Sequence, residues 1–245
     1  MNNSIVLSVF LILGGMMGCT KPTESAAPVV ESNKVAEQGL EQEEANMHGE
    51  HEHHHSGFDD PKKFETRWND PERDNWQHPE EIIAALALMP GATVADIGAG
   101  TGYMVAHLSK TVGDIGTVIA IDAEQAMITY LARRSGDLGP ARIVPRKVRA
   151  ESPDLENDRV DGAVALNIWH HIGGREAYAK KVYAGLRRGG RFVVVDSKVD
   201  AISGPPQKMR LEEGQVVKEL EAGGFRAEVA HESMPQHYMI VGHKD

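Results

Sequence analysis

The sequence predicts an α/β fold, doubly wound around a mostly parallel, seven-stranded sheet whose last strand is antiparallel. Two observations lead to this fold class. Apolar runs of strand length alternate with helix-length segments from residue 79 to the end of the chain. One apolar run, 93–97, breaks into a turn holding Gly98, Gly100 and Gly102, and a helix pattern follows it. A strand, a glycine turn and a helix in this order bring backbone very close to a nucleotide-like ligand.

Residues beside the glycine turn indicate the charge of that ligand. A dinucleotide site needs a third glycine where this chain has Tyr103, which is too bulky for the close packing required. Asp96 ends the strand just before the turn, where its carboxylate would repel a pyrophosphate from the helix N-terminus. A cationic ligand therefore fits better, and an NAD-dependent oxidoreductase is disfavoured. The alternative is an ordinary tight strand-to-helix turn, but the acid, the three glycines and a downstream acid occur together.

The helices are predicted from apolar spacing and from the prolines and glycines that bracket them. The first runs over 80–89 between prolines, with one apolar face made of Ile82, Ile83, Leu86 and Met89. The helix after the glycine turn passes through Val105, Leu108 and Val112, and another over 123–134 turns Met127 and Leu131 inward. Later helices are expected over 175–186, with Ala177, Val182 and Leu186 on its apolar side, and over 209–222.

The strands are predicted from short apolar runs. Besides 93–97 they cover 117–121, 142–148, 160–166, 192–195, 225–230 and 237–242. Pro145 interrupts one run and places that strand at the sheet edge, because proline cannot donate to a ladder. The final strand is expected to be antiparallel.

With these motifs in place, the chain from Asp59 to its end resembles a class I S-adenosylmethionine (SAM)-dependent methyltransferase of Rossmann-like fold. Asp96, Gly98, Gly100 and Gly102 match the family's first motif, and Asp122 matches its second. The resemblance implies SAM as the cofactor, which brings both an ammonium and a sulfonium. The residues that it implies for cofactor binding are Asp96, Gly98, Ala99, Gly100, Gly102, Tyr103, Asp122, Ala150 and Asn167.

For Asp122 there is also a chemical reason for the assignment, and beside Ala150 the sequence departs from the family pattern. A ribose needs a bidentate acceptor for its two hydroxyls, and the Asp122 carboxylate at a strand end supplies one. Arg149 stands where the family usually has an acid against the adenine, which leaves the backbone N–H of Ala150 as the adenine contact.

Asn167, His170 and His171 follow the strand 160–166 and are expected to face the methyl-transfer site. One histidine would act as a general base toward a hydroxyl, thiol or amine, since imidazole titrates near neutral pH. The alternative is that one histidine is packed and the other caps the next helix. Trp76 is expected either to cover the ligand as part of a lid or, with Trp68, to plug the side of the core.

The predicted activity is SAM-dependent methylation of a small-molecule acceptor. Positioning of donor and acceptor supplies most of the rate of such a transfer, which agrees with a strong cofactor signature and no catalytic triad. The competing hypothesis is a membrane-tethered SAM- or metal-binding protein that has the fold but transfers no methyl group. The formal net charge of −10 argues against nucleic acid as a partner.

The N-terminal residues predict an exported protein. Residues 1–19 resemble a lipoprotein signal peptide, with a short apolar core before the single cysteine, Cys19. A lipidated Cys19 would anchor the protein to the bacterial cell envelope, facing the periplasm or the outside. A cytoplasmic protein with an apolar extension is the alternative. Within this scheme, 58–245 is the methyltransferase domain.

Residues 20–57 are rich in Glu and Gln and lack aromatic residues, which predicts a disordered acidic tether. Five histidines between residues 48 and 55 alternate with glutamates. Such a run either binds a divalent metal or is a solvated polar tail. No catalytic metal is expected.

Overall fold

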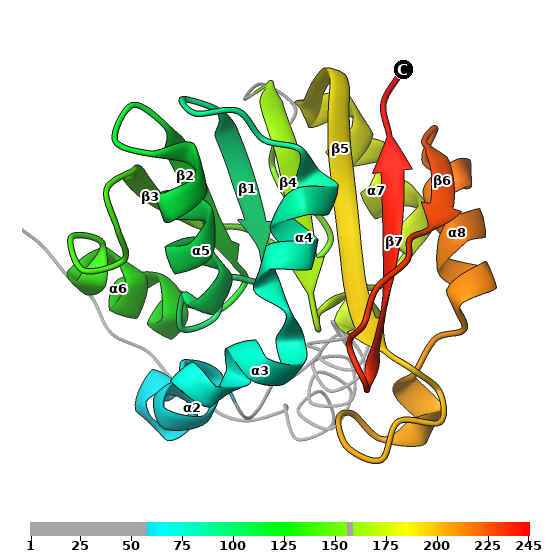
Figure 1. Ribbon diagram of the computed structural model, residues 1–245, viewed down its shortest axis with the longest axis horizontal. Helices are drawn as coiled ribbons and strands as arrows, with labels where there is room; N and C mark the ends of the chain where they lie inside the picture. Colours follow the sequence, from blue (N-terminus) through cyan, green and yellow to red (C-terminus); the bar gives the residue numbers. More distant parts are fainter. Residues whose placement is uncertain (1–57, 156–158) are drawn as a thin grey trace, which may run out of the picture. The chain divides into compact units, whose positions relative to one another are not determined.

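A seven-stranded sheet forms the centre of the computed structural model, which describes residues 58–155 and 159–245 (Figure 1). The strand order is β3-β2-β1-β4-β5-β7-β6. The first five strands in this order pair in parallel, and β7 pairs antiparallel with both β5 and β6. The strands are β1 (Thr93–Ile97), β2 (Thr117–Asp122), β3 (Arg142–Lys147), β4 (Val160–Leu166), β5 (Leu186–Ser197), β6 (Arg226–Val229) and β7 (His237–His243). The predicted fold class is confirmed, with Pro145 on the edge strand β3.

Helices cover both faces of the sheet. Leu86, Leu108 and Leu131 belong to one buried cluster with Val94 of β1, while Val182 and Leu220 belong to a second cluster with Ile97. Alternate residues of one strand therefore serve two separate cores. The helices are α2 (Pro61–Trp68), α3 (Asp74–Gln77), α4 (Pro79–Leu86), α5 (Tyr103–Val112), α6 (Gln125–Arg134), α7 (Arg175–Gly185) and α8 (Glu213–Ala222), and the 3-10 turns are η1 (Pro71–Arg73), η2 (Trp169–His171) and η3 (Gln207–Met209).

Three helix predictions were wrong in detail. Helix α4 ends at Leu86 because Ala87 takes a left-handed φ of 49°, so Met89 lies outside the helix and is 73% exposed. Ala177 is exposed, and α7 buries Tyr178, Ala179 and Val182 instead, while Leu186 already belongs to β5. Helix α8 begins at Glu213 rather than at residue 209, after the separate turn η3.

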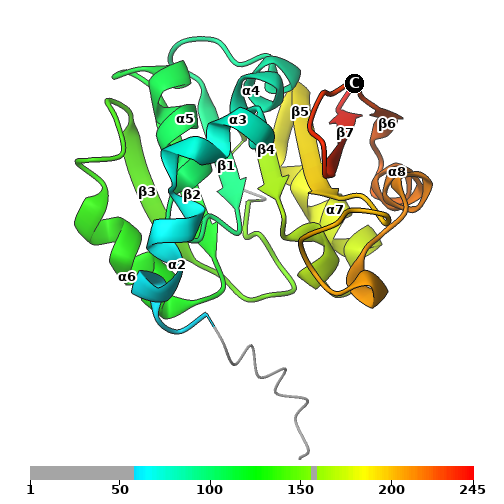
Figure 2. The same ribbon diagram turned by 60° about the horizontal axis from the view of Figure 1, so that its bottom comes forward.

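The N-terminal part of the described chain lies beyond the carboxyl ends of β1 and β4 (Figures 1 and 2). We call residues 58–77 the cover segment. Asp60 caps α2 by accepting a hydrogen bond from the Lys62 N–H, and Pro61 occupies its first turn. The segment is attached to the glycine turn, because the Thr101 hydroxyl donates to Asn69 Oδ1 at 2.8 Å and the Asn69 amide donates to the Thr101 carbonyl.

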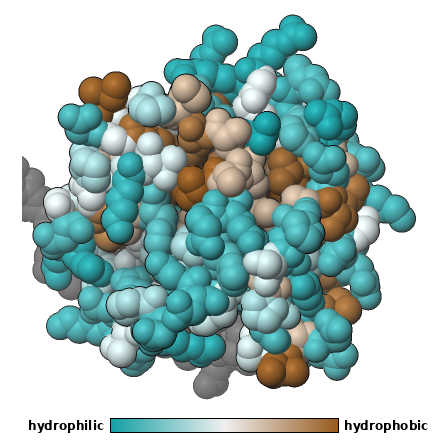
Figure 3. All heavy atoms as spheres, viewed as in Figure 1, coloured by the Kyte–Doolittle hydropathy of each residue, from teal (hydrophilic) through white to brown (hydrophobic). Residues whose placement is uncertain are grey.

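The surface is mostly hydrophilic on the face drawn in Figure 3, with hydrophobic atoms gathered near α4. Across residues 58–155 and 159–245, every helix is too short or too polar to cross a bilayer. The predicted signal peptide 1–19, the lipidated Cys19 and the tether 20–57 all lie outside the described residues.

Candidate cofactor and acceptor site

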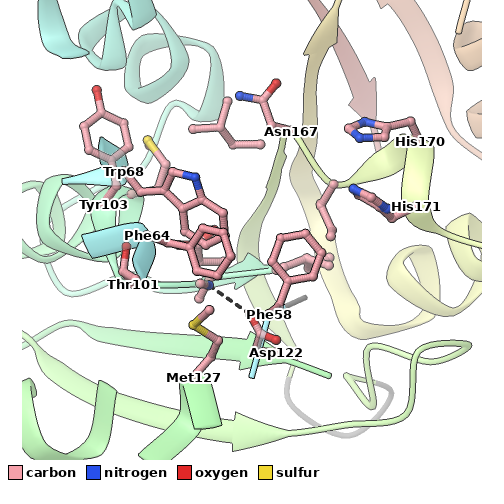
Figure 4. Close-up of a pocket in the computed structure, with 18 of the residues that line it drawn as sticks. Phe58, Phe64, Trp68, Thr101, Tyr103, Asp122, Met127, Asn167, His170 and His171 are labelled. Carbon is pink, nitrogen blue, oxygen red and sulfur yellow. Dashed lines mark hydrogen bonds between the residues drawn. The ribbon is translucent and has the colours of Figure 1, made fainter. Parts of the chain in front are cut away.

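A cavity of about 670 Å³ opens at the carboxyl ends of β1, β2, β4 and β5 (Figure 4). It lies between β1 and β4, where the order of strands along the chain reverses, which is the usual ligand position in open α/β sheets. The cover segment closes one side. The predicted site residues that line it are Asp96, Gly98, Ala99, Gly100, Tyr103, Asp122, Ala150, Asn167, His170 and His171.

Gly102 is the one predicted site residue that does not line the cavity. Its φ is 93°, and a β-carbon here would lie 2.9 Å from Leu131 Cδ2 of α6. Glycine is thus required at this position for packing of the turn against a neighbouring helix. At Gly98, φ is 74° and a β-carbon would lie 2.6 Å from Ile168 Cγ1, so this glycine keeps the turn close to the end of β4.

Asp122 joins the second strand to the glycine turn. Its Oδ2 accepts a hydrogen bond from the Gly100 N–H at 2.9 Å, marked in Figure 4, and its Oδ1 accepts from the Glu124 N–H at 2.8 Å. Burial raises the pKa of this carboxyl, and the two backbone donors oppose that effect. A carboxylate offers about four lone-pair positions, so the same two oxygens still have capacity for a pair of ribose hydroxyls.

Asp96 is 2% exposed, and its Oδ2 has no hydrogen-bond partner among the described residues. Burial, followed by the nearby Asp122 carboxylate, raises the pKa of Asp96 to about 7, while Arg73 acts in the opposite direction. A buried carboxylate oxygen without a partner is costly, and a cationic group in the cavity would satisfy it. The site therefore fits the ammonium of SAM.

The acceptor end of the cavity holds a histidine fixed by a carboxylate. Ring Nδ1 of His170 lies 2.8 Å from Asp196 Oδ1, and the His170 backbone N–H donates to Asp196 Oδ2 at 3.0 Å. Both side chains are buried, at 3% and 1% exposure. Beside them, Asn167 takes a left-handed φ of 56°, and its Oδ1 lacks a partner within the described part of the chain.

His171 lies beside His170, with ring centroids 4.2 Å apart, and makes an edge contact with Phe58 of the cover segment. Both rings line the cavity. Helix α7 begins after Gly174, a residue with no side chain to cap it.

Aromatic side chains of the cover segment form the wall opposite the glycine turn. Phe58, Phe64 and Trp68 pack together, with Phe64 and Trp68 stacked at 4.5 Å, and Figure 4 shows them in front of Asp122. Trp76 stacks on His237 at 5.8 Å. Trp68 and Trp76 both line the cavity, which agrees with the lid interpretation rather than with a plug in the core.

Sequence reasoning missed Arg73 and His237 as cavity residues, and it missed Asp196 as the buried partner of His170. Asp196 follows the predicted strand 192–195, and its place at a strand end beside β4 was a usable signal. His237 begins the antiparallel strand β7, so its first residue meets the carboxyl end of β5, opposite Ser197. Burial lowers the pKa of His237 to about 4. Within the described residues, no group of His, Cys, Asp or Glu side chains is arranged to hold a metal ion.

Comparisons with known proteins agree with this geometry. Residues 94–190 match a family model described as a methyltransferase domain. The chain is similar to a SAM-dependent methyltransferase structure from Aquifex aeolicus, with a TM-score of 0.68 and 26% identity over 75% of this chain and 97% of that one. Together the matches support a SAM-dependent methyltransferase, with SAM as its cofactor.

The similar curated sequences match a smaller part of the chain. An uncharacterised 37.1 kDa protein in transposon TN4556 of Streptomyces fradiae is 27% identical over 50% of this chain and 35% of that protein. The ubiquinone/menaquinone biosynthesis C-methyltransferase UbiE of Vibrio campbellii is 28% identical over 44% of this chain and 42% of that enzyme. The chain thus spans less than half the length of these relatives.

Proposed function

We propose that this protein transfers a methyl group from SAM to a small-molecule acceptor. The observation that carries the proposal is the presence, in one cavity, of the Asp96–Asp122 glycine-turn site at one end and of His170, held from behind by Asp196, at the other. The cavity volume of about 670 Å³ is in the range of small-molecule sites.

The cofactor would be held by residues of β1, β2 and the loop after β3. Asp96 would bind the ammonium, Asp122 the ribose hydroxyls and the Ala150 backbone N–H the adenine, while the glycine turn would lie against the ligand. When bound, SAM supplies a methyl group on a sulfonium, which is already a good leaving group. The chain therefore has to orient the two reactants and exclude water rather than activate the donor.

At the acceptor end, His170 is the proposed general base. A carboxylate only accepts hydrogen bonds, so with Asp196 ionised Nδ1 carries the proton and Nε2 of a neutral ring is the free acceptor. Nε2 would take the proton of an acceptor hydroxyl, thiol or amine as the nucleophile forms its bond to the methyl carbon. Asp196 would stabilise the imidazolium that results.

Two measurements test the proposal with the purified full-length chain. Isothermal titration should show binding of SAM, and Asp96→Ala should abolish it. Transfer of a radiolabelled methyl group should follow with a member of a panel of phenols, thiols, arsenicals, amines and quinols. Quinols are included because of the similarity to UbiE. A chain that ignores SAM but binds NAD would overturn the proposal.

A second candidate is a tethered binding protein with this fold and no methyl transfer. The signal-like residues before Cys19 favour it, because SAM is made in the cytoplasm and an exported protein would face away from that supply. SAM binding without transfer to any member of the panel would support this candidate.

The envelope location is also a proposal, based on the sequence of residues 1–19. Labelled palmitate should be incorporated into the chain expressed in a bacterium, and Cys19→Ser should abolish the labelling. For the histidine run at 48–55, zinc titration of the full chain against a variant with these histidines changed to Asn tests metal binding.

A further inference from the structure

Arg73 is a cation inside the candidate cofactor cavity. It ends η1 in the cover segment, where Nη1 donates to the Trp68 carbonyl at 2.8 Å and Nη2 donates to Gln77 Oε1 at 3.1 Å. Its guanidinium carbon lies 3.9 Å from the centre of the Tyr103 ring. These contacts hold the side chain in place but leave Nε, which is buried and has no hydrogen-bond partner in the described ranges.

Asp96 is the opposite charge in the same cavity, and its Oδ2 likewise has no partner. No ion pair joins Arg73 to Asp96 among the described residues, although each affects the ionisation of the other. Burial lowers the pKa of Arg73 to about 10, and the Tyr103, Asp96 and Asp74 charges oppose that effect. Two opposite charges thus share one cavity, and each has a buried atom without a partner among the described residues.

An α-amino acid group has the complementary charges. It carries an ammonium and a carboxylate on the same carbon, so a carboxylate and a guanidinium placed on two sides can bind one group each. We infer that Arg73 binds the carboxylate of the amino-acid end of SAM, while Asp96 binds its ammonium. This inference rests on the proposed function and extends it to a residue outside the matched segment 94–190.

Arg73 also connects this contact to the acceptor end. Its guanidinium carbon lies 5.7 Å from the Trp76 ring, and Trp76 stacks on His237. A carboxylate held by Arg73 therefore fixes the cover segment over both halves of the cavity. The competing explanation is that Arg73 only supports the cover, through the Trp68 carbonyl and Gln77.

A pair of ligands separates the two explanations. Decarboxylated SAM keeps the amine, the sulfonium and the adenosine but lacks the carboxylate. In isothermal titrations of the full chain, we expect SAM to bind about 10- to 100-fold more tightly than decarboxylated SAM, the size of a charge-assisted contact. Arg73→Gln should weaken SAM binding to the level of the decarboxylated compound and leave the affinity for that compound unchanged.

Lys62 provides the matched control, because it is an exposed cation of the same segment and does not line the cavity. Lys62→Gln should keep the preference of the wild type, and thermal unfolding checks that each variant is folded. Equal binding of both ligands by the wild type overturns the role of Arg73 and leaves the cofactor assignment intact. An Arg73→Gln variant that weakens both ligands equally, or keeps the preference, also overturns it. If the wild type binds neither compound, the proposed function itself fails and this inference with it.

Discussion

Asp196 holds His170 from two directions, through the ring Nδ1 at 2.8 Å and through the backbone N–H at 3.0 Å. The first contact fixes the tautomer, and the second fixes the position of the main chain that carries the ring. Because His170 lies in η2 just after β4 and Asp196 lies near the end of β5, their pairing depends on two neighbouring parallel strands having the register observed. The arrangement makes separate predictions for the ring and for its partner.

Asp196→Asn should slow methyl transfer about 10²- to 10⁴-fold, the usual contribution of a general base, because an amide donor permits the wrong tautomer. SAM affinity should stay within about twofold, since Asp196 does not line the cavity and contacts His170 at its other end. Single-turnover transfer to the best acceptor of the panel measures the first quantity, and titration measures the second. His171→Asn is the control and should retain most of the rate. A full rate in Asp196→Asn would show that His170 does not need this tautomer.

In the protein without ligand, Asp96 should make the free energy of unfolding fall as the pH rises. Its pKa is raised from 3.8 to about 7 by burial, so the folded state holds a proton that the unfolded state loses between these pH values. Asp96→Asn removes this effect, and the difference in unfolding free energy between variant and wild type should grow by on the order of 4 kcal/mol from pH 4 to pH 8. Urea unfolding at both pH values measures it. SAM binding by the wild type should strengthen through pH 7, as the carboxylate ionises, and a flat profile would contradict this.

His237 should have the opposite effect, so that the free energy of unfolding falls as the pH falls. Its pKa is lowered from 6.5 to about 4 by burial, so the unfolded state binds a proton first as the pH falls. The wild type should lose on the order of 3 kcal/mol between pH 6.5 and pH 4 for this reason, and His237→Phe should not. In the wild type this loss is masked by the gain at Asp96 over the same range. The unfolding free energy is therefore measured at both pH values for His237→Phe, for Asp96→Asn and for the double variant. The double variant should show the smallest dependence of stability on pH.

Gly98→Ala should destabilise the fold more than Gly113→Ala. Both residues have a φ near 74°, but a β-carbon meets Ile168 at 2.6 Å in the first case and nothing within 4 Å in the second. The strained backbone alone costs about 1 to 2 kcal/mol, and the clash at Gly98 should add a similar amount. Denaturant midpoints give the two values. Equal losses would mean that Ile168 moves aside freely.

Local motifs made the cofactor end of the site predictable. Asp96 and Asp122 lie at the carboxyl ends of β1 and β2, and the glycine turn follows β1 directly, so their place at this edge comes from sequence order alone. His237 and Arg73 reach the same cavity through longer-range contacts. His237 depends on the antiparallel register of β7 with β5, and Arg73 depends on the cover being attached to Thr101 through Asn69. Met89 was misplaced because apolar spacing does not show where Ala87 would leave the helix.

The two backbone hydrogen bonds accepted by Asp122 prepare this carboxylate in advance for the ribose hydroxyls of a nucleoside. Gly100 and Glu124 immobilise this carboxylate during folding, so little rotational freedom remains to be lost when hydroxyl groups arrive. The sugar end of the cavity thus resembles a fixed receptor into which a nucleoside can dock without rearrangement. Any slow step of ligand entry should then arise at the aromatic wall on the other side.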